Sequence, residues 1–295
     1  MNRCMGQNAT LYRLFEQVSR NVWENLRDSY NLGLYMGEEG ITDHLLLTLA
    51  RNAVGQIKLA KVSKPLEGTT GADWEWWFVR DALGFGMRVQ AKKLRPDSLR
   101  YVGLKDTIGH SGVRRQVDLL IDKAESAMPS LYPAYCFYNF WSDNHKLPQW
   151  NCASFRLVFP ELFGCSIADA HRVRACLDEG RDDLATIGPL ACPLICLVCD
   201  CICSSKESLP QRVCRAAEAL RNDTYDRPSS EGTIQYYTIY TSNKFVINDN
   251  AIPPRVTDVP DYVMGCLEEG LETRQAIRSY LERQHLDGLL IVREK

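Results

Sequence analysis

The sequence predicts an α/β fold in which helices flank a central mixed sheet. Apolar residues recur at helical spacing near the N-terminus, and after residue 55 the pattern changes to the alternation expected of strands. In the first half, two helices are predicted at 9–30 and 37–52, followed by three strands at 56–64, 71–79 and 87–94. A helix at 110–127 and a strand at 134–141 come next. With 45% hydrophobic and 24% charged residues, the 295-residue chain has globular rather than disordered composition.

The two N-terminal helices are predicted from their apolar stripes. The first carries Leu11, Leu14, Phe15, Val18, Val22 and Leu26 on one face. In the second, Thr42 is a candidate N-cap for the stripe of Leu45 and Leu49.

The three strands are expected to form an antiparallel meander. Residues 81–86 (DALGFG) are rich in turn formers, which predicts a tight connection between the second and third strands. The seventh segment, 134–141, is rich in aromatic residues and is expected to be a buried strand.

The pattern is weaker after residue 145, which suggests a core at 1–145 and a C-terminal α/β region of unknown role at 146–295; packing of the two as one domain is the open alternative. Helices are predicted at 166–179 and 261–284, a loop at 226–233, and strands at 236–242, 244–249 and 288–294.

No membrane partner is expected. The most apolar stretch, 187–203, is interrupted by Gly188, Pro189, Pro193 and Asp200 and is too short for a spanning helix. Residues 1–17 lack the apolar centre of a signal peptide, so a cytoplasmic location is expected.

Three polar residues on the second and third strands are candidates for a catalytic cluster. Side chains alternate along a strand, so Asp73 and Glu75 share one face, and Gln90 and Lys92 share one face of the next strand. If the two strands are neighbours, a carboxylate, a carboxamide and an ammonium group come together.

This combination suits hydrolysis of a phosphodiester. Mg²⁺ or Mn²⁺ prefers oxygen ligands, which Asp73 and Gln90, or a carbonyl beside Gln90, can supply. A bound cation polarises the phosphate and lowers the pKa of water. Lys92 can position that water or stabilise the charge that develops on the phosphate.

The run from Asp73 to Gln90-Ala91-Lys92 resembles the D…(E/Q)xK signature of the PD-(D/E)xK nuclease superfamily, and its glutamine version is similar to the Mrr-like restriction endonucleases. EEGITD…GADWEWWF…RVQAKK also resembles a family of uncharacterised bacterial proteins placed in that superfamily, a likeness that extends to ADAHRVR and CLVC. The resemblance implies a restriction-endonuclease-like core and a metal-dependent DNA endonuclease. It also implies a role in restriction or anti-phage defence as one option, with a homodimer useful for paired cuts.

The resemblance also implies a glutamate on the helix before the sheet. Glu39 lies at the matching place and is assigned as a metal ligand, with Glu38 as the adjacent candidate. This sequence departs from the strict pattern because Gln90 replaces an acidic residue, which removes one charge from the metal site. Glu75, on the Asp73 face, could compensate.

Local charge suggests contact with nucleic acid, because residues 80–123 contain ten basic and five acidic residues in a chain of net charge −2. Such a patch can bind phosphates, although the alternative is an ordinary solvated helix face. The candidate contacts are Lys93, Arg95, Arg114, Arg115 and Gln116.

Twelve cysteines include a group in the segment 192–203, with a CxxC at Cys196 and Cys199. Cys192, Cys196, Cys199 and Cys201 are candidates for a structural zinc site, and an iron–sulfur centre is another option. The segment is very apolar, so a buried strand of packed thiols is the favoured interpretation.

Two other functions stay open. The glutamine in QAK allows a binding protein with a degenerate nuclease core, and the cysteines allow an interaction protein stabilised by zinc or an iron–sulfur centre.

Overall fold

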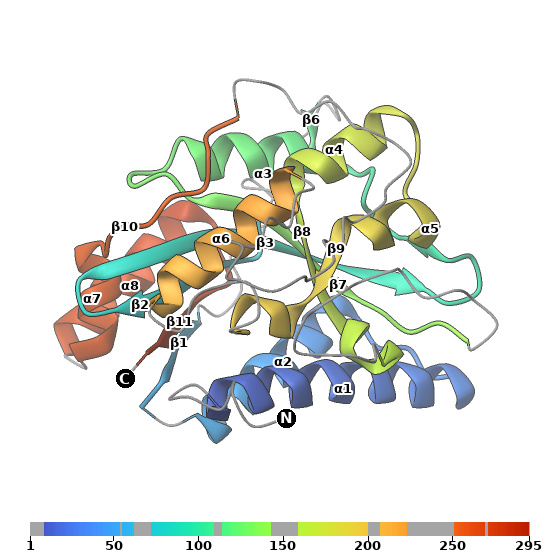
Figure 1. Cartoon of the computed structure of the whole chain (residues 1–295), viewed down its shortest axis with the longest axis horizontal. Helices are drawn as coiled ribbons and strands as arrows, with labels where there is room; N and C mark the ends of the chain where they lie inside the picture. Colours follow the sequence, from blue (N-terminus) through green and yellow to red (C-terminus); the bar gives the residue numbers. More distant parts are fainter. Residues whose placement is uncertain are drawn as a thin grey trace, which may run out of the picture.

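The computed structural model contains a central mixed β-sheet with helices packed around it (Figure 1). It describes residues 9–53, 55–61, 72–108, 114–142, 159–199, 207–222, 251–268 and 271–294. The predicted strands at 236–249 and the predicted loop at 226–233 lie outside these residues.

The two predicted N-terminal helices are present as α1 (Ala9–Asn31) and α2 (Glu38–Asn52). The predicted cap of α2 is wrong, because the helix begins four residues before Thr42 and has Gly37 at its N-cap. Thr42 lies inside the helix, where its hydroxyl donates to the Glu38 carbonyl and hydrogen-bonds Tyr138. Glu38 and Glu39 thus occupy the first turn, where the helix dipole favours negative charge.

Seven strands form the continuous path of the sheet. In spatial order they are β1 (Ile57–Lys61), β11 (Gly288–Arg293), β2 (Trp74–Arg80), β3 (Leu83–Arg95), β7 (Tyr132–Tyr138), β8 (Cys165–Asp169) and β9 (Ala191–Pro193). Two short strands, β4 (Arg100–Tyr101) and β10 (Thr257–Asp258), pair with β3 outside this path, and β5 (Thr107–Ile108) pairs with β6 (Arg114–Arg115) in a separate ribbon.

The predicted meander is wrong at its first connection. β11, from the end of the chain, lies between β1 and β2, antiparallel to the first and parallel to the second. Residues 288–292 of β11 are all buried, as expected for a central strand with covered faces. The C-terminal region therefore contributes a central strand to the same sheet.

The β2–β3 hairpin is tighter than the turn formers of residues 81–86 suggested. Only Asp81 and Ala82 separate the strands, and β3 already begins at Leu83. Gly86 lies opposite Trp77 in the register, where a Cβ atom would come within 2.7 Å of the indole ring. This glycine therefore makes room for Trp77 rather than for a turn.

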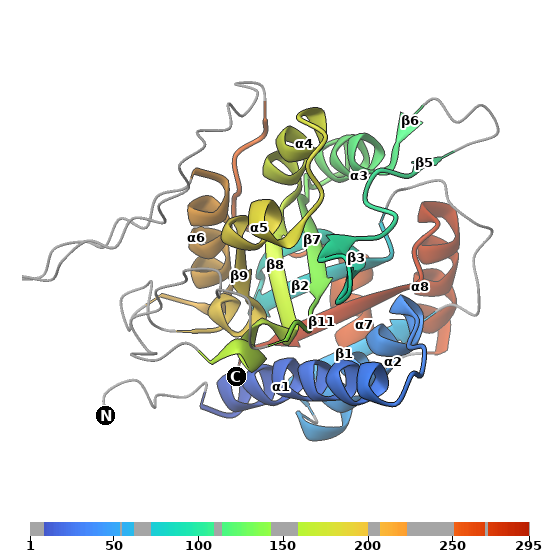
Figure 2. The ribbon, with the colours of Figure 1, turned by 90° about the vertical axis from the view of Figure 1, so that its right-hand side faces the viewer.

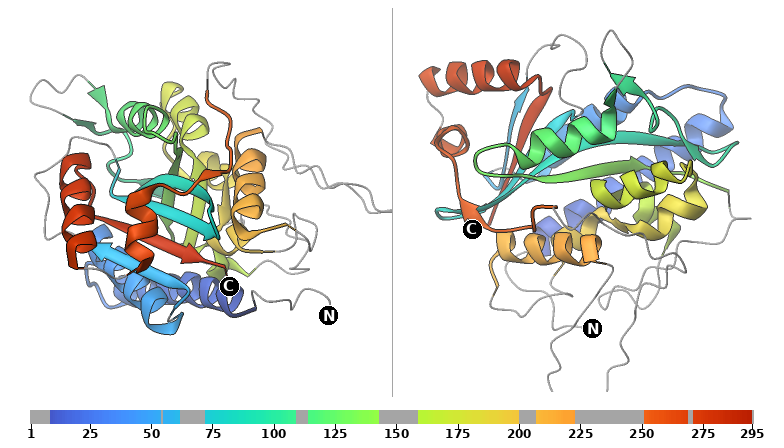
Figure 3. Two further views of the ribbon diagram at one scale, coloured as in Figure 1. Left: turned by 90° about the vertical axis from the view of Figure 1, so that its left-hand side faces the viewer. Right: turned by 90° about the horizontal axis from the view of Figure 1, so that it is seen from above.

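Helices surround the sheet. α6 (Leu209–Asn222) lies on one side, and α7 (Asp261–Glu268) and α8 (Leu271–Gln284) lie on the other (Figures 2 and 3). α3 (Gln116–Glu125) packs against α4 (Ala170–Asp178).

The remaining helical elements are short. They are α5 (Leu184–Ile187) and the 3₁₀ turns η1 (Pro160–Gly164), η2 (Gly188–Leu190) and η3 (Leu194–Leu197). The predicted helices at 110–127 and 166–179 begin too early. In the structure α3 begins at Gln116 and α4 at Ala170. Residues 114–115 and 166–169 belong to strands, and residues 110–113 lie outside the described residues. Among the described helices, none combines the length and the apolar character needed to cross a membrane.

Candidate functional site

Asp73 and Gln90 meet at the end of the β2–β3 hairpin. The antiparallel register pairs Trp74 with Val89, which brings Asp73 opposite Gln90, as the alternation of side chains predicted. Oδ2 of Asp73 accepts hydrogen bonds from Gln90 Nε2 at 2.8 Å and from the Ala91 backbone N–H at 2.9 Å. Gln90 Nε2 also lies 3.2 Å from the Ala91 carbonyl oxygen.

Gln116 holds the other end of the Gln90 carboxamide. It is the first residue of α3, and its Nε2 donates to Gln90 Oε1 at 3.0 Å. The Oε1 atom of Gln116 is buried and has no hydrogen-bond partner among the described residues. Sequence analysis placed Gln116 among the nucleic-acid contacts; in the structure it orients Gln90.

Lys92 lies two residues beyond Gln90, on the same face of β3, and its side chain is buried. Gly103, at φ +71°, lies against its ammonium group: a Cβ atom there would be 3.2 Å from Lys92 Nζ and 2.9 Å from Asp106 Oδ2. Lys92 and Asp106 line the wall of an open cavity of about 840 Å³. Glycine at 103 therefore leaves the space in which the ammonium group sits.

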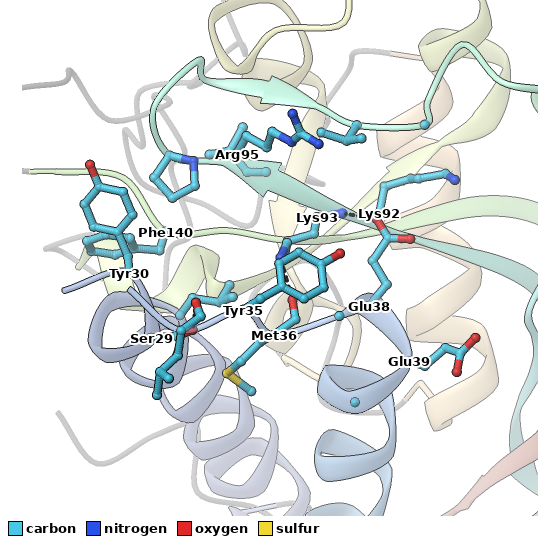
Figure 4. A pocket seen from close by; sticks show the side chains of 18 of the residues that line it. Ser29, Tyr30, Tyr35, Met36, Glu38, Glu39, Lys92, Lys93, Arg95 and Phe140 are labelled. Carbon is cyan, nitrogen blue, oxygen red and sulfur yellow. Dashed lines mark hydrogen bonds between the residues drawn. The ribbon is translucent and has the colours of Figure 1, made fainter. Parts of the chain in front are cut away.

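Glu38, rather than Glu39, contacts the strand that carries Lys92. Its Oε1 accepts a 2.9 Å hydrogen bond from the Lys93 backbone N–H, and Figure 4 shows it pointing from α2 toward Lys92 and Lys93. Burial raises the pKa of Glu38, and nearby Lys92 partly opposes this rise. Glu39 is exposed and points away from these lysines in Figure 4, but its charge acts on Asp287.

Asp287 is a site residue that the sequence analysis missed. It immediately precedes β11, its backbone N–H donates to the Asp73 carbonyl at 2.7 Å, and it is half-buried. Burial raises the pKa of Asp73 to about 7; the Ala91 N–H opposes the rise and the charge of Asp287 adds to it. The pKa of Asp287 is also raised, by burial and then by Glu39. One signal was available, since Asp73 and Asp287 each directly precede an apolar strand.

These residues could hold a hard divalent cation only after the Gln90 carboxamide turns, because its amide nitrogen now faces Asp73. Crowded carboxylates with raised pKa values favour a bound cation, which lowers those values again. Asp73 Oδ2 and the Ala91 carbonyl already face the Gln90 amide. If the carboxamides of Gln90 and Gln116 both turn by 180°, Gln90 Nε2 donates to Gln116 Oε1, so the hydrogen bond between them is kept. Gln90 Oε1 then faces Asp73 and is the third oxygen at this place, after those of Asp73 and Ala91. Within the described ranges, no group of three His, Cys, Asp or Glu residues is arranged to hold a metal ion, so amide and backbone oxygens would be needed.

Glu75 does not lie at this site. It is fully buried, and it accepts hydrogen bonds from Trp77 Nε1 at 2.8 Å, from Tyr280 at 3.0 Å and from Tyr262. Arg88 Nε lies 3.6 Å from its Oε2. Glu75 therefore ties α7 and α8 to the sheet and does not supply the charge that Gln90 lacks. The indoles of Trp74, Trp76 and Trp77 are all buried.

The basic excess in residues 80–123 does not form one free patch. Arg115 binds Asp118 at 2.8 Å and Asp178 at 2.6 Å, which with its other contacts raises its pKa, and Arg114 pairs with Asp122. Arg88 is buried beside Glu75, and Lys105 and Arg100 pair with Asp182. The count of charges along the sequence was misleading because several partners come from distant segments. Lys93 and the exposed Arg95 line the cavity.

The described cysteines of the cluster lie in the hydrophobic core. Cys192 is on β9, Cys196 is in η3, and Cys199 follows two residues after η3; all three are buried. The favoured interpretation as packed thiols fits this burial, although among the described residues 192–199 only Cys192 and Pro193 belong to a strand. Cys201 lies outside the described residues.

Comparison with known proteins identifies one family. The model of a family of unknown function (DUF6615) matches residues 11–295. No curated protein and no solved structure matches the chain.

Proposed function

The chain belongs to the DUF6615 family, whose function is unknown, and we propose that it is a metal-dependent nuclease that hydrolyses phosphodiester bonds of DNA. The observation that carries the proposal is that Asp73 and Gln90 are hydrogen-bonded at the end of the β2–β3 hairpin, while Lys92 lies on the same face of β3 as Gln90 and lines an open cavity. The β2–β3 hairpin, followed by α3 and then by β7 parallel to β3, supports the proposal of a restriction-endonuclease-like core.

The proposed mechanism assigns a separate task to each side chain. Asp73, the Gln90 carboxamide and the Ala91 carbonyl would hold Mg²⁺ or Mn²⁺, which when bound polarises a phosphate and lowers the pKa of water. Lys92 faces the place where the phosphate would lie and stabilises the negative charge that develops on its oxygens. Its burial strengthens this electrostatic effect, because little water screens the ammonium group.

The residues that surround Asp73, Gln90 and Lys92 hold these side chains in position. The Ala91 N–H fixes the Asp73 carboxylate, and Gln116 fixes the Gln90 carboxamide. Glu38 and Asp106 lie near Lys92, and the attraction between their carboxylates and its ammonium group holds the side chain in place. Cutting both strands of a duplex would use two copies of the chain, and a role in restriction or anti-phage defence belongs to the same proposal.

A second candidate is a nucleic-acid-binding protein with a degenerate nuclease core. Its supporting observation is that Gln90 donates its amide group to Asp73, an arrangement that is stable without a cation. The two candidates differ in a single measurable property, which is hydrolysis in the presence of a divalent cation.

The deciding experiment is a cleavage assay on plasmid, linear duplex, single-stranded DNA and RNA with Mg²⁺ or Mn²⁺. The nuclease proposal expects cleavage that Asp73→Ala and Lys92→Ala abolish while circular dichroism shows folded protein. The matched control is Lys123→Ala, which removes an exposed lysine from α3. Tight binding without cleavage in either metal would support the degenerate core instead.

A further inference from the structure

The last turn of α1 and the segment that joins it to α2 expose a cluster of apolar side chains. Tyr30, Leu32, Leu34 and Tyr35 are 46%, 72%, 64% and 87% exposed, and they lie within six consecutive residues. Three of them, all except Leu32, line the cavity that also contains Lys92. Clustered exposed apolar side chains at a concave site indicate a binding surface.

Tyr35 is held in place although it is exposed. The ammonium group of Lys93 lies 4.2 Å from the centre of its ring, and the same group donates to the Met36 carbonyl. This contact orients the ring and leaves most of its surface in solvent. An exposed aromatic ring that is already oriented can stack on a planar ligand at low entropic cost.

The aromatic groups and the catalytic candidates follow one another along the cavity. Figure 4 shows Tyr30 and Phe140 at one end, Tyr35 and Lys93 in the middle, and Lys92 with Glu38 at the other end. The rings of Tyr30 and Phe140 are 5.9 Å apart, the ammonium group of Lys93 lies over the Tyr35 ring, and Glu38 accepts a hydrogen bond from the Lys93 backbone N–H. A ligand that stacks on Tyr35 would therefore extend toward Lys92.

Charge in the cavity disfavours a ligand held mainly by its phosphates. The cationic lining residues are Lys92, Lys93 and Arg95, and the anionic ones are Glu38, Glu39, Asp97 and Asp106. A duplex buries its bases and depends on phosphate contacts, whereas a single strand offers base faces for stacking. Arg114 and Arg115, which were predicted to contact nucleic acid, are paired with carboxylates.

We propose that this cavity binds an unpaired stretch of DNA, with a base stacked on Tyr35 and the adjoining phosphodiester directed toward Lys92. This inference rests on the proposed nuclease function and names the form of its substrate. Because the affinity comes from stacking, it depends only weakly on salt concentration compared with binding that neutralises many phosphates.

Equilibrium binding tests the inference without any cleavage. Fluorescence anisotropy in EDTA would compare a labelled oligothymidine with a labelled duplex of equal length. Tyr35→Ala should weaken binding of the single strand by roughly 5- to 150-fold, the range for loss of one stacked base, and should change duplex binding by less than about twofold.

Two variants serve as controls. Tyr35→Phe keeps the ring and should bind as the wild type does. Phe159→Ala removes another exposed aromatic, which lies under Arg20 and outside the cavity lining, and should also have no effect.

The inference fails if oligothymidine does not bind, if Tyr35→Ala leaves its affinity unchanged, or if duplex affinity falls equally. This failure is separate from failure of the nuclease proposal. Cleavage that requires Lys92 but does not depend on Tyr35 would refute only the proposed binding of unpaired DNA. Binding that depends on Tyr35, without cleavage in Mg²⁺ or Mn²⁺, would refute only the proposed nuclease activity.

Discussion

The backbone N–H of Ala91, on β3, donates a 2.9 Å hydrogen bond to Oδ2 of Asp73, the residue that directly precedes β2. This bond and the one from Gln90 stabilise the ionised carboxylate, yet burial and the charge of Asp287 prevail and raise the pKa of Asp73 to about 7. Asp73 is therefore held in a fixed position, in surroundings that resist its negative charge.

The first prediction concerns the pH dependence of stability without metal. Unfolded Asp73 releases its proton near pH 3.8, and the folded protein keeps it until about pH 7. Between these values the native state binds more protons than the unfolded state, so its stability falls as pH rises. The shift sets an upper limit of about 4 kcal/mol, which partial exposure reduces to roughly 1–2 kcal/mol.

Urea unfolding of wild type and Asp73→Asn in EDTA, at pH 4.5 and pH 8, measures this effect. The variant should gain stability relative to the wild type as pH rises, because asparagine does not titrate. Using the difference between the two proteins cancels the titration of other groups. A constant difference across this range would show that the pKa of Asp73 is not raised.

The second prediction separates Glu75 from the metal site. Glu75→Ala leaves Arg88 buried without its carboxylate and removes the acceptor of Trp77 and both tyrosines. We expect it to lower the free energy of unfolding by roughly 3–5 kcal/mol. Glu282→Ala, an exposed glutamate on α8, should change it by only about 0.5 kcal/mol. A metal ligand would behave differently: its loss would reduce Mn²⁺ affinity without a loss of stability of this size.

The third prediction concerns Gln116 as a positioning residue. Glutamate at 116 can only accept a hydrogen bond when ionised, so Gln116→Glu turns the Gln90 amide nitrogen toward residue 116 and its oxygen toward Asp73. We expect Mn²⁺ to bind about tenfold more tightly, by isothermal titration calorimetry. Gln116→Leu should weaken binding by about tenfold, as is common when a residue behind a ligand is lost.

The added charge of Gln116→Glu attracts cations by itself, so a double-mutant cycle with Gln90→Leu is needed. If orientation of Gln90 matters, Gln116→Glu should strengthen Mn²⁺ binding clearly less in the Gln90→Leu background. An equal gain in both backgrounds would mean that charge alone is responsible and that Gln116 does not position Gln90.

The sequence predicted the part of the site that depends on local geometry. Alternation along two strands joined by a short turn was enough to bring Asp73 opposite Gln90, with Lys92 on the same face. The choice between Glu38 and Glu39 was beyond this reasoning, because neighbouring helix positions point about 100° apart and the angle of α2 to the sheet is set by packing.

Features that depend on distant segments were missed. The insertion of β11 between β1 and β2 joins residues more than 200 positions apart, and it alone brings Asp287 beside Asp73. Neutralisation of Arg115 by Asp178 has the same origin. An apolar strand pattern shows that a segment is buried, but it does not identify the neighbour with which the strand pairs.

The last prediction tests the role of Lys92 in catalysis. Lys92→Met keeps an unbranched side chain of similar length in the buried position and removes the positive charge. If Lys92 stabilises the charge that develops on the phosphate, kcat should fall by about 10²- to 10³-fold while KM changes little. Lys123→Met, on the exposed face of α3, should cleave like the wild type.

A second measurement is independent of cleavage. The ammonium group of Lys92 opposes the rise in the pKa of Glu38, so in Lys92→Met the Glu38 carboxylate should be protonated at higher pH, which an NMR titration can measure. Wild-type kcat in Lys92→Met, together with the expected change at Glu38, would mean that this lysine is a structural partner of Glu38 and takes no part in hydrolysis.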